Sequence, residues 1–103
     1  YVRFLKKDST GIVDIDVSDA ADDAPVVDAV IQVTLKDADG VDLIGQAWPL
    51  QVPHVEAGSY IGYFSHELDV EIDVAYSAQI VVTSVTAGVA TLSVPVMFEV
   101  YAE

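Results

Sequence analysis

Clusters of acidic residues are the first feature of this sequence that could do chemistry, because carboxylate oxygens are the ligands that Ca²⁺ prefers. One cluster consists of Asp37, Asp39 and Asp42. A calcium loop of the EF-hand type needs Gly at its sixth position and Glu at its twelfth. Here Gly40 is fourth counted from Asp37, and no Glu stands at the twelfth position. We therefore expect a turn, in which Asp39-Gly40 tolerates positive φ, rather than a calcium site.

The densest acidic cluster lies nearer the N-terminus. Within ten residues the chain carries the carboxylates of Asp14, Asp16, Asp19, Asp22 and Asp23. Such a run could bind calcium between a strand end and a loop, but it is more typical of a solvated surface that favours solubility. The chain also has no cysteine, which excludes a disulfide framework and a thiolate zinc site. We expect no metal and no cofactor.

The two histidines are the other candidate ligands or catalytic groups. His54 and Glu56 share a face if their segment is extended, and His66 could approach them as a zinc ligand, but the set has no defined spacing. Ser65-His66-Glu67 contains the residue types of a hydrolase triad. Neighbours on a strand point to opposite faces, however, so they cannot adopt the geometry of a triad. We predict that the chain is not an enzyme.

A binding role fits the cations and the aromatic residues better. Residues 1–7 contain three cations and no acid, whereas residues 8–103 contain one base and 17 acids, a charge of −16. We expect the basic segment either to pair as a first strand on its own sheet or to reach a neighbouring subunit, steered by its charges. Exposed tyrosines on an acidic surface indicate a contact with a partner that would shield them from water. The predicted interface consists of Arg3, Phe4, Lys6, Lys7, Tyr63 and Tyr101.

Trp48 and Met97 could also lie at a rim, where exposed aromatic residues serve either a protein interface or a carbohydrate platform. The net charge of −13 argues against nucleic acid and against an anionic membrane surface, since both need excess positive charge. A membrane-spanning helix needs about 18 uncharged apolar residues. The longest uncharged stretch is instead interrupted by polar residues and alternates like a strand. We expect a protein partner, including a second copy of the chain.

Apolar and polar residues alternate along much of the chain, which is typical of half-buried strands. The clearest case is residues 29–36, in which every second residue from Ala29 onward is apolar. Asp39-Gly40 is a strong hairpin signal, so residues 41–48 are expected to return as the partner strand. Further strands are expected over residues 11–17, 50–52, 59–65, 75–83 and 89–101, the last being the longest, with a turn over 54–58.

These segments predict an all-β fold, a sandwich of two antiparallel sheets with about seven or eight strands. Residues 1–10 are expected to form the basic arm or first strand, and residues 11–103 the sandwich. At 103 residues the chain suits one domain with one core. The aromatic residues expected in that core are Tyr60, Phe64, Tyr76 and Phe98.

Three segments carry a characteristic order of motifs. They are Val33-Thr34-Leu35-Lys36-Asp37-Ala38-Asp39-Gly40, Gly58-Ser59-Tyr60-Ile61-Gly62-Tyr63-Phe64 and Ala75-Tyr76-Ser77-Ala78-Gln79-Ile80. The series resembles the immunoglobulin-like sandwiches of bacterial surface proteins and of phage or prophage virion proteins. In those domains a strand ends in an Asp-Gly hairpin, a Gly-x-Tyr strand follows, and a later x-Tyr-x-Ala strand leads into the last hairpin. The resemblance covers about residues 25–101, and the cysteine pair of antibody domains is missing.

The resemblance implies a structural or adhesive role without catalytic residues. We expect a component of a phage or prophage particle, in the head–tail region or as a decoration, that acts through protein contacts. It would reside in the virion, or in the host cytoplasm during assembly. The alternative is a calcium-dependent adhesion or carbohydrate-binding module on the extracellular surface of a bacterium.

Overall fold

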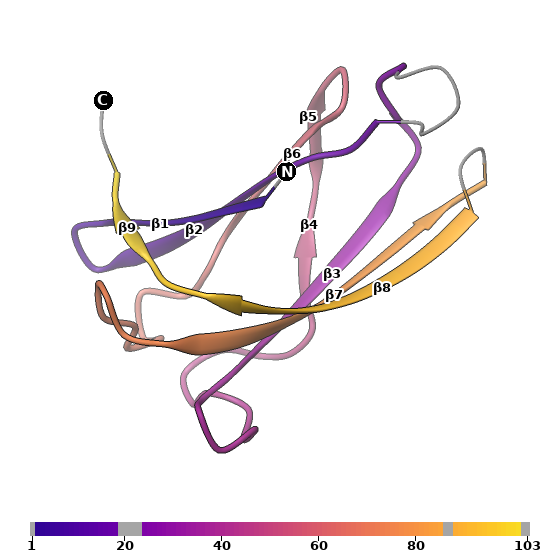
Figure 1. The fold of residues 1–103 in the computed structure, drawn as a ribbon. Helices are drawn as coiled ribbons and strands as arrows, with labels where there is room; N and C mark the ends of the chain where they lie inside the picture. Colours follow the sequence, from indigo (N-terminus) through magenta and orange to yellow (C-terminus); the bar gives the residue numbers. More distant parts are fainter. Residues whose placement is uncertain (1, 19–23, 86–87, 102–103) are drawn as a thin grey trace.

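The computed structural model describes residues 2–18, 24–85 and 88–101 (Figure 1). These residues form nine strands and no helix. One sheet has the order β5 (His54–Glu56), β6 (Ser59–Tyr63), β2 (Thr10–Asp16), β1 (Val2–Lys7) and β9 (Glu99–Val100). The other has the order β4 (Leu50–Val52), β3 (Val30–Lys36), β7 (Tyr76–Ser84) and β8 (Gly88–Val96).

The predicted all-β fold with two sheets is confirmed, with two differences in detail. The described residues form nine strands, whereas seven or eight were expected. The pairing of β1 with β9 is parallel, while every other pair of neighbouring strands is antiparallel. The parallel pair arises because the chain leaves β8 in one sheet and β9 then lies beside β1 in the other.

Alternation explains which faces of the strands are buried. In β3 the side chains of Ile31, Val33 and Leu35 are buried, and the residues between them are more exposed. In β7 the inward positions Ala78 and Ile80 are buried. The two sheets therefore present apolar faces to each other, and the removal of each large apolar side chain from water contributes about 1.5–3 kcal/mol to folding.

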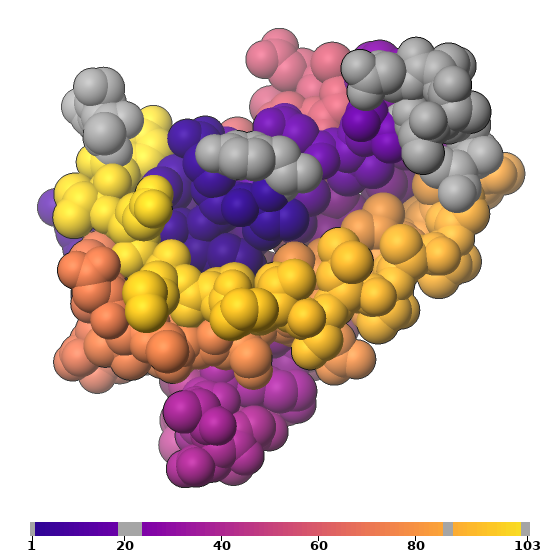
Figure 2. Space-filling view, in the orientation of Figure 1, coloured from indigo at the N-terminus to yellow at the C-terminus, as the bar shows by residue number. Residues whose placement is uncertain are grey.

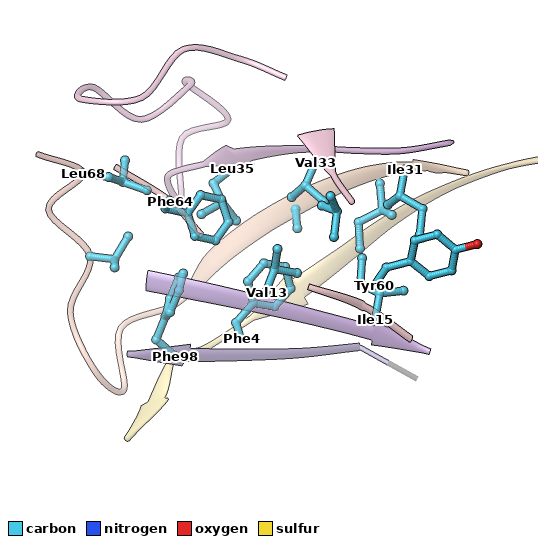
Figure 3. Packing of buried hydrophobic residues seen from close by; sticks show 14 residues of the cluster. Phe4, Val13, Ile15, Ile31, Val33, Leu35, Tyr60, Phe64, Leu68 and Phe98 are labelled. Atoms are coloured by element: carbon cyan, nitrogen blue, oxygen red, sulfur yellow. The ribbon is translucent and has the colours of Figure 1, made fainter. Parts of the chain in front are cut away.

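The core lies between the two sheets (Figure 3). Its buried residues come from both sheets and from the segments that connect them: Phe4, Val13, Ile15, Ile31, Val33, Leu35, Val52, Tyr60, Phe64, Leu68, Val70, Ala78, Ile80 and Phe98. Tyr60, Phe64 and Phe98 are buried as predicted, and Tyr76 packs against the cluster while partly buried. The Tyr60 hydroxyl donates to the carbonyl of Val26 at 2.8 Å and accepts from the amide of Ala29 at 3.0 Å.

The prediction that residues 41–48 form a strand paired with residues 29–36 is wrong. A single bridge joins Lys36 to Asp42, and β3 pairs instead with β4 and β7. The backbone amides of Asp37 and Leu43 donate to the carbonyls of Val41 and Leu35 around this bridge, and the Asp37 carboxylate accepts from the amides of Asp39 and Val41 in the turn. The chain then forms a loop that projects from the sandwich at the bottom of the space-filling view (Figure 2).

Two other expected segments also differ. The single strand expected over residues 89–101 breaks at Met97 and Phe98, because the chain crosses there from the four-stranded to the five-stranded sheet. The turn expected over residues 54–58 contains the short strand β5, which pairs with β6 across an irregular register.

Candidate interaction surface

Four of the six predicted interface residues meet at one depression on the outer face of the five-stranded sheet. They are Arg3, Lys7, Tyr63 and Tyr101. The depression has a volume of about 220 Å³, and its remaining lining residues are Leu5, Ile12, Asp14 and Ile61. The strand register explains the grouping, because Leu5, Ile12 and Tyr63 occupy one cross-strand row of β1, β2 and β6.

The floor of this depression is apolar and its rim is polar. Leu5 and Ile12 are each only 7% exposed although they lie on the outer face of the sheet. Tyr63 is 65% exposed. The backbone amide of Tyr101 donates to the carbonyl of Lys6 at 3.0 Å, which holds the end of β9 beside β1. The sheet thus carries an amphipathic hollow rather than a flat surface.

Charged groups complete the rim. The Arg3 guanidinium lies 2.6 Å from one carboxylate oxygen of Asp14, and the other oxygen of Asp14 is buried without a hydrogen-bond partner. The Lys7 ammonium lies 5.3 Å from the centre of the Tyr101 ring, at cation–π distance. Two of the four cations of an acidic chain therefore converge on this depression.

Phe4 and Lys6 do not belong to this surface. Residues 2–7 form β1, which lies between β2 and β9 inside its sheet, so alternation turns Phe4 and Lys6 to the opposite face from Arg3 and Lys7. Phe4 is 4% exposed and packs in the core. The Lys6 ammonium donates to the carbonyl of Val70 at 2.7 Å. Their inclusion in the predicted interface is corrected, because the segment is an interior strand.

The other two rim candidates are separate from this depression. Trp48 is partly buried, donates from its indole nitrogen to the Leu43 carbonyl at 2.8 Å, and packs its ring against Phe64. Met97 is 55% exposed and lies beside a second hollow of about 240 Å³ between β1 and the end of β8.

The acidic clusters have other roles where the structure describes them. Asp37 closes the turn after β3, and Asp42 forms an ion pair with Lys36 at 2.6 Å. Asp14 pairs with Arg3, while Asp19, Asp22 and Asp23 lie outside the described residues. Among residues 2–18, 24–85 and 88–101, no three His, Asp or Glu side chains group in a way that could hold a metal ion.

The histidine and serine candidates are dispersed. The His54 ring lies within hydrogen-bond distance of the Ala57 carbonyl, at 2.6 Å. His66 is exposed in the connection after β6. The Ser65 hydroxyl accepts a hydrogen bond from the amide of Glu67, which is a local turn contact. These contacts position no nucleophile against a base.

The four-stranded sheet is distinguished by its lack of acid. The chain has 17 acidic residues, yet β3, β4, β7 and β8 contain none, and Lys36 is their one charged residue. The outward residues of this sheet are mostly Gln, Ser, Thr and Val. Like-charge repulsion is therefore weakest over this sheet, although the molecule as a whole is strongly negative.

Within the described chain the two sheets have four edges, and three of them are blunted. Strand β4 has three residues and lies between Pro49 and Pro53, β5 has three residues, an irregular register and Glu56, and β9 has two residues and Glu99. Short strands, prolines, irregularities and charges are the usual protection against pairing with another chain. Strand β8 has nine residues and no charge, and Gly88 to Ser93 are all exposed. It runs uncovered along one side of the molecule in orange (Figure 2).

Pro95 indicates which backbone groups face the free edge of β8. The β7–β8 ladder continues without a register shift through the pair Ser77–Pro95. Because proline has no N–H to give to β7, its nitrogen faces the open edge. Alternate residues of a strand turn their N–H and C=O groups to the same side. Val89, Thr91 and Ser93 therefore direct their N–H and C=O groups away from β7. We call these outward backbone groups the β8 edge.

Alternation alone does not mark β8 as the most exposed edge. The sequence signal that indicates this edge is the absence of charge from residues 74 to 98 in a chain with 17 acids.

Comparisons with protein family models, with curated proteins and with solved structures find no match. Within the described residues no helix is long and apolar enough to cross a membrane.

Proposed function

We propose that this chain is a non-enzymatic structural or assembly domain that acts through protein–protein contacts, with the β8 edge as the contact. The observation that carries the proposal is a nine-residue, uncharged and exposed edge strand on a chain of net charge −13. An open edge offers main-chain donors and acceptors to an added strand, and the side chains beside it set specificity.

Charge supports this choice of surface over the others. Strands of the five-stranded sheet carry acidic residues, whereas β3, β4, β7 and β8 contain none. Two acidic proteins can therefore pair at this edge with the least repulsion. No catalytic or metal-holding group is needed for such a role.

We further propose that the fold is immunoglobulin-like. The neighbours β1, β2, β6 and β5 occur in the order of the A, B, E and D strands of such domains, and β4, β3, β7 and β8 in the order C′, C, F and G. The strand order supports this assignment, and β9 is an addition to it. The resemblance to phage or prophage virion proteins makes a virion component the proposed setting, and a bacterial surface protein the alternative.

A strand peptide tests the proposed function directly. The probe is a synthetic peptide with the sequence of β7, residues Tyr76–Ser84, because β8 already accepts that strand on its other side. We expect the peptide to shift the NMR signals and slow the hydrogen exchange of the amides at Val89, Thr91 and Ser93. The matched variants are Thr91→Glu, which should abolish the effect, and Ile44→Glu, which adds the same charge at a loop residue that is 92% exposed.

The proposal is wrong if no edge amide responds up to the solubility limit of the peptide in a sample that sedimentation shows to be monomeric. It is equally wrong if Thr91→Glu and Ile44→Glu bind the peptide alike, because the effect would then not depend on the β8 edge.

The depression on the five-stranded sheet favours a second candidate function, the carbohydrate-binding module. Tyr63 and Tyr101 could stack on a sugar ring, while Arg3 and Asp14 at the rim could bind its hydroxyls. This candidate predicts that cellobiose or maltose raises the melting temperature and that Tyr63→Ala abolishes the rise. A melting temperature unchanged by both sugars would count against it.

A further inference from the structure

We propose that the strand added at the β8 edge is β8 of a second copy of this chain, so that two four-stranded sheets form one continuous sheet across a two-fold axis. The inference rests on the proposed function and names its partner.

The charge distribution favours a second copy. Two copies repel each other through a net charge of −13 each, and this repulsion is weakest where both surfaces lack acid. A two-fold axis brings the same patch of each copy together. Two β8 strands in an antiparallel pair place an uncharged strand against an uncharged strand.

Pro95 restricts the register of this pair. The outward residues with an N–H donor are Val89, Thr91 and Ser93, and Pro95 has none. An axis at Thr91 pairs Thr91 with its own counterpart and Val89 with Ser93 of the second copy, so that every outward donor is used. An axis at Ser93 would instead oppose Thr91 to Pro95 and lose a hydrogen bond on each side. The geometry therefore points to the axis at Thr91.

The core-facing side of β8 gives an independent reason. Leu92 is paired with the fully buried Ile80 of β7, yet it remains 45% exposed. With the axis at Thr91, Leu92 lies opposite Ala90 of the second copy, and the two Leu92 side chains flank the axis on the same face. Pairing thus removes from water the apolar side chain that the fold leaves half covered.

Single cysteines test the pair and its register, since the chain has no cysteine of its own and any disulfide must join two copies. Two residues opposite each other in a hydrogen-bonded antiparallel pair have Cα atoms about 5.5 Å apart, within disulfide range. We expect Thr91→Cys to form a covalent dimer rapidly under mild oxidation. Val89→Cys is the matched control on the same face, because Val89 lies about 13 Å from its counterpart in this register. Ile44→Cys controls for random collision.

Sedimentation of the unmodified chain completes the test. We expect its average mass to rise with concentration, Thr91→Glu to remain a monomer, and Ile44→Glu to behave as the unmodified chain does. The inference is overturned if Val89→Cys or Ile44→Cys dimerises as fast as Thr91→Cys, or if the unmodified chain stays monomeric.

If the β7 peptide protects the edge amides but the chain stays monomeric, the second copy is excluded while the proposed function stands. If neither peptide nor second copy binds, both proposals fail.

Discussion

Phe4 stands among three cations, Arg3, Lys6 and Lys7, in a segment that its charge suggests is a basic arm or a first strand. In the structure its ring lies 5.5 Å from that of Phe98 and 6.4 Å from that of Phe64, within the core. The difference comes from alternation in β1, which separates adjacent residues onto opposite faces of the sheet. The role of Phe4 therefore depends on the face of β1 to which its side chain points, and not on the charge of the surrounding segment.

Replacing Phe4 with Ala should destabilise the fold strongly. The change removes a buried ring that contacts two other aromatic rings, and such truncations cost about 3–5 kcal/mol. Urea denaturation followed by circular dichroism measures the loss. Tyr63→Ala is the matched aromatic control at an exposed position and should cost about 1 kcal/mol or less. Equal losses in the two variants would contradict the burial of Phe4.

Tyr60→Phe tests a polar contact inside the core. Its hydroxyl bonds to the Val26 carbonyl and the Ala29 amide, and removing it leaves both backbone groups without that partner. We expect a loss of about 1–3 kcal/mol in the free energy of unfolding, because unsatisfied buried groups carry their desolvation cost. Tyr63→Phe, at an exposed ring, should change stability by about 0.5 kcal/mol or less. A Tyr60→Phe variant with unchanged stability would show that the bridge is not needed.

At the scale of elements, the sequence predicted strands more reliably than their partners. Alternation correctly placed β3 and β7, since a period of two directly reports which side chains are buried. The hairpin after Asp39-Gly40 stops after one bridge, and β3 pairs with β4 instead of with residues 43–48. Pairing depends on contacts with distant segments such as β4 and β7, and these leave no local mark in the sequence.

Alternation also fails to reveal the break between β8 and β9. Apolar residues alternate through Val94, Val96 and Phe98, and all three turn toward the core. The chain nevertheless changes sheets after Val96. Since both sheets present their apolar faces to one interior, a crossing strand keeps its alternation, and the sequence pattern cannot reveal the crossing. For the depression, the sequence predicted Arg3, Lys7, Tyr63 and Tyr101 but not the floor residues Leu5 and Ile12. These two residues lie side by side only because of the register between β1 and β2, which the sequence pattern does not reveal.

Two adjacent proline substitutions should separate the roles of the two sides of β8. Leu92 turns its N–H toward β7, so Leu92→Pro should break the hairpin and cost about 3 kcal/mol or more. Thr91 turns its N–H to the open edge, so Thr91→Pro should cost clearly less while abolishing association. Thermal melting and sedimentation measure the two effects. If Thr91→Pro were the more destabilising variant, the assignment of outward donors from Pro95 would be wrong.

At the scale of the whole molecule, charge and apolar surface are segregated. Within residues 2–18, 24–85 and 88–101, the acidic residues lie on the five-stranded sheet and in the segments between strands, whereas the four-stranded sheet carries none. Net charge keeps copies apart in solution, and the uncharged β8 edge leaves one place where they can pair. This arrangement would confine the association that we propose to one defined surface.

Salt should therefore strengthen self-association. At an ionic strength of about 0.01 M the screening length is about 30 Å, comparable to the molecule, and two copies of charge −13 repel over their whole surfaces. At about 1 M it falls to about 3 Å, and the contacts at β8 act almost without opposition. Sedimentation at the two ionic strengths should show more dimer at the higher one, with Thr91→Glu monomeric at both. The opposite trend would point to attraction between the cations of β1 and the acids of another copy, and so to a contact at the depression in place of the β8 edge.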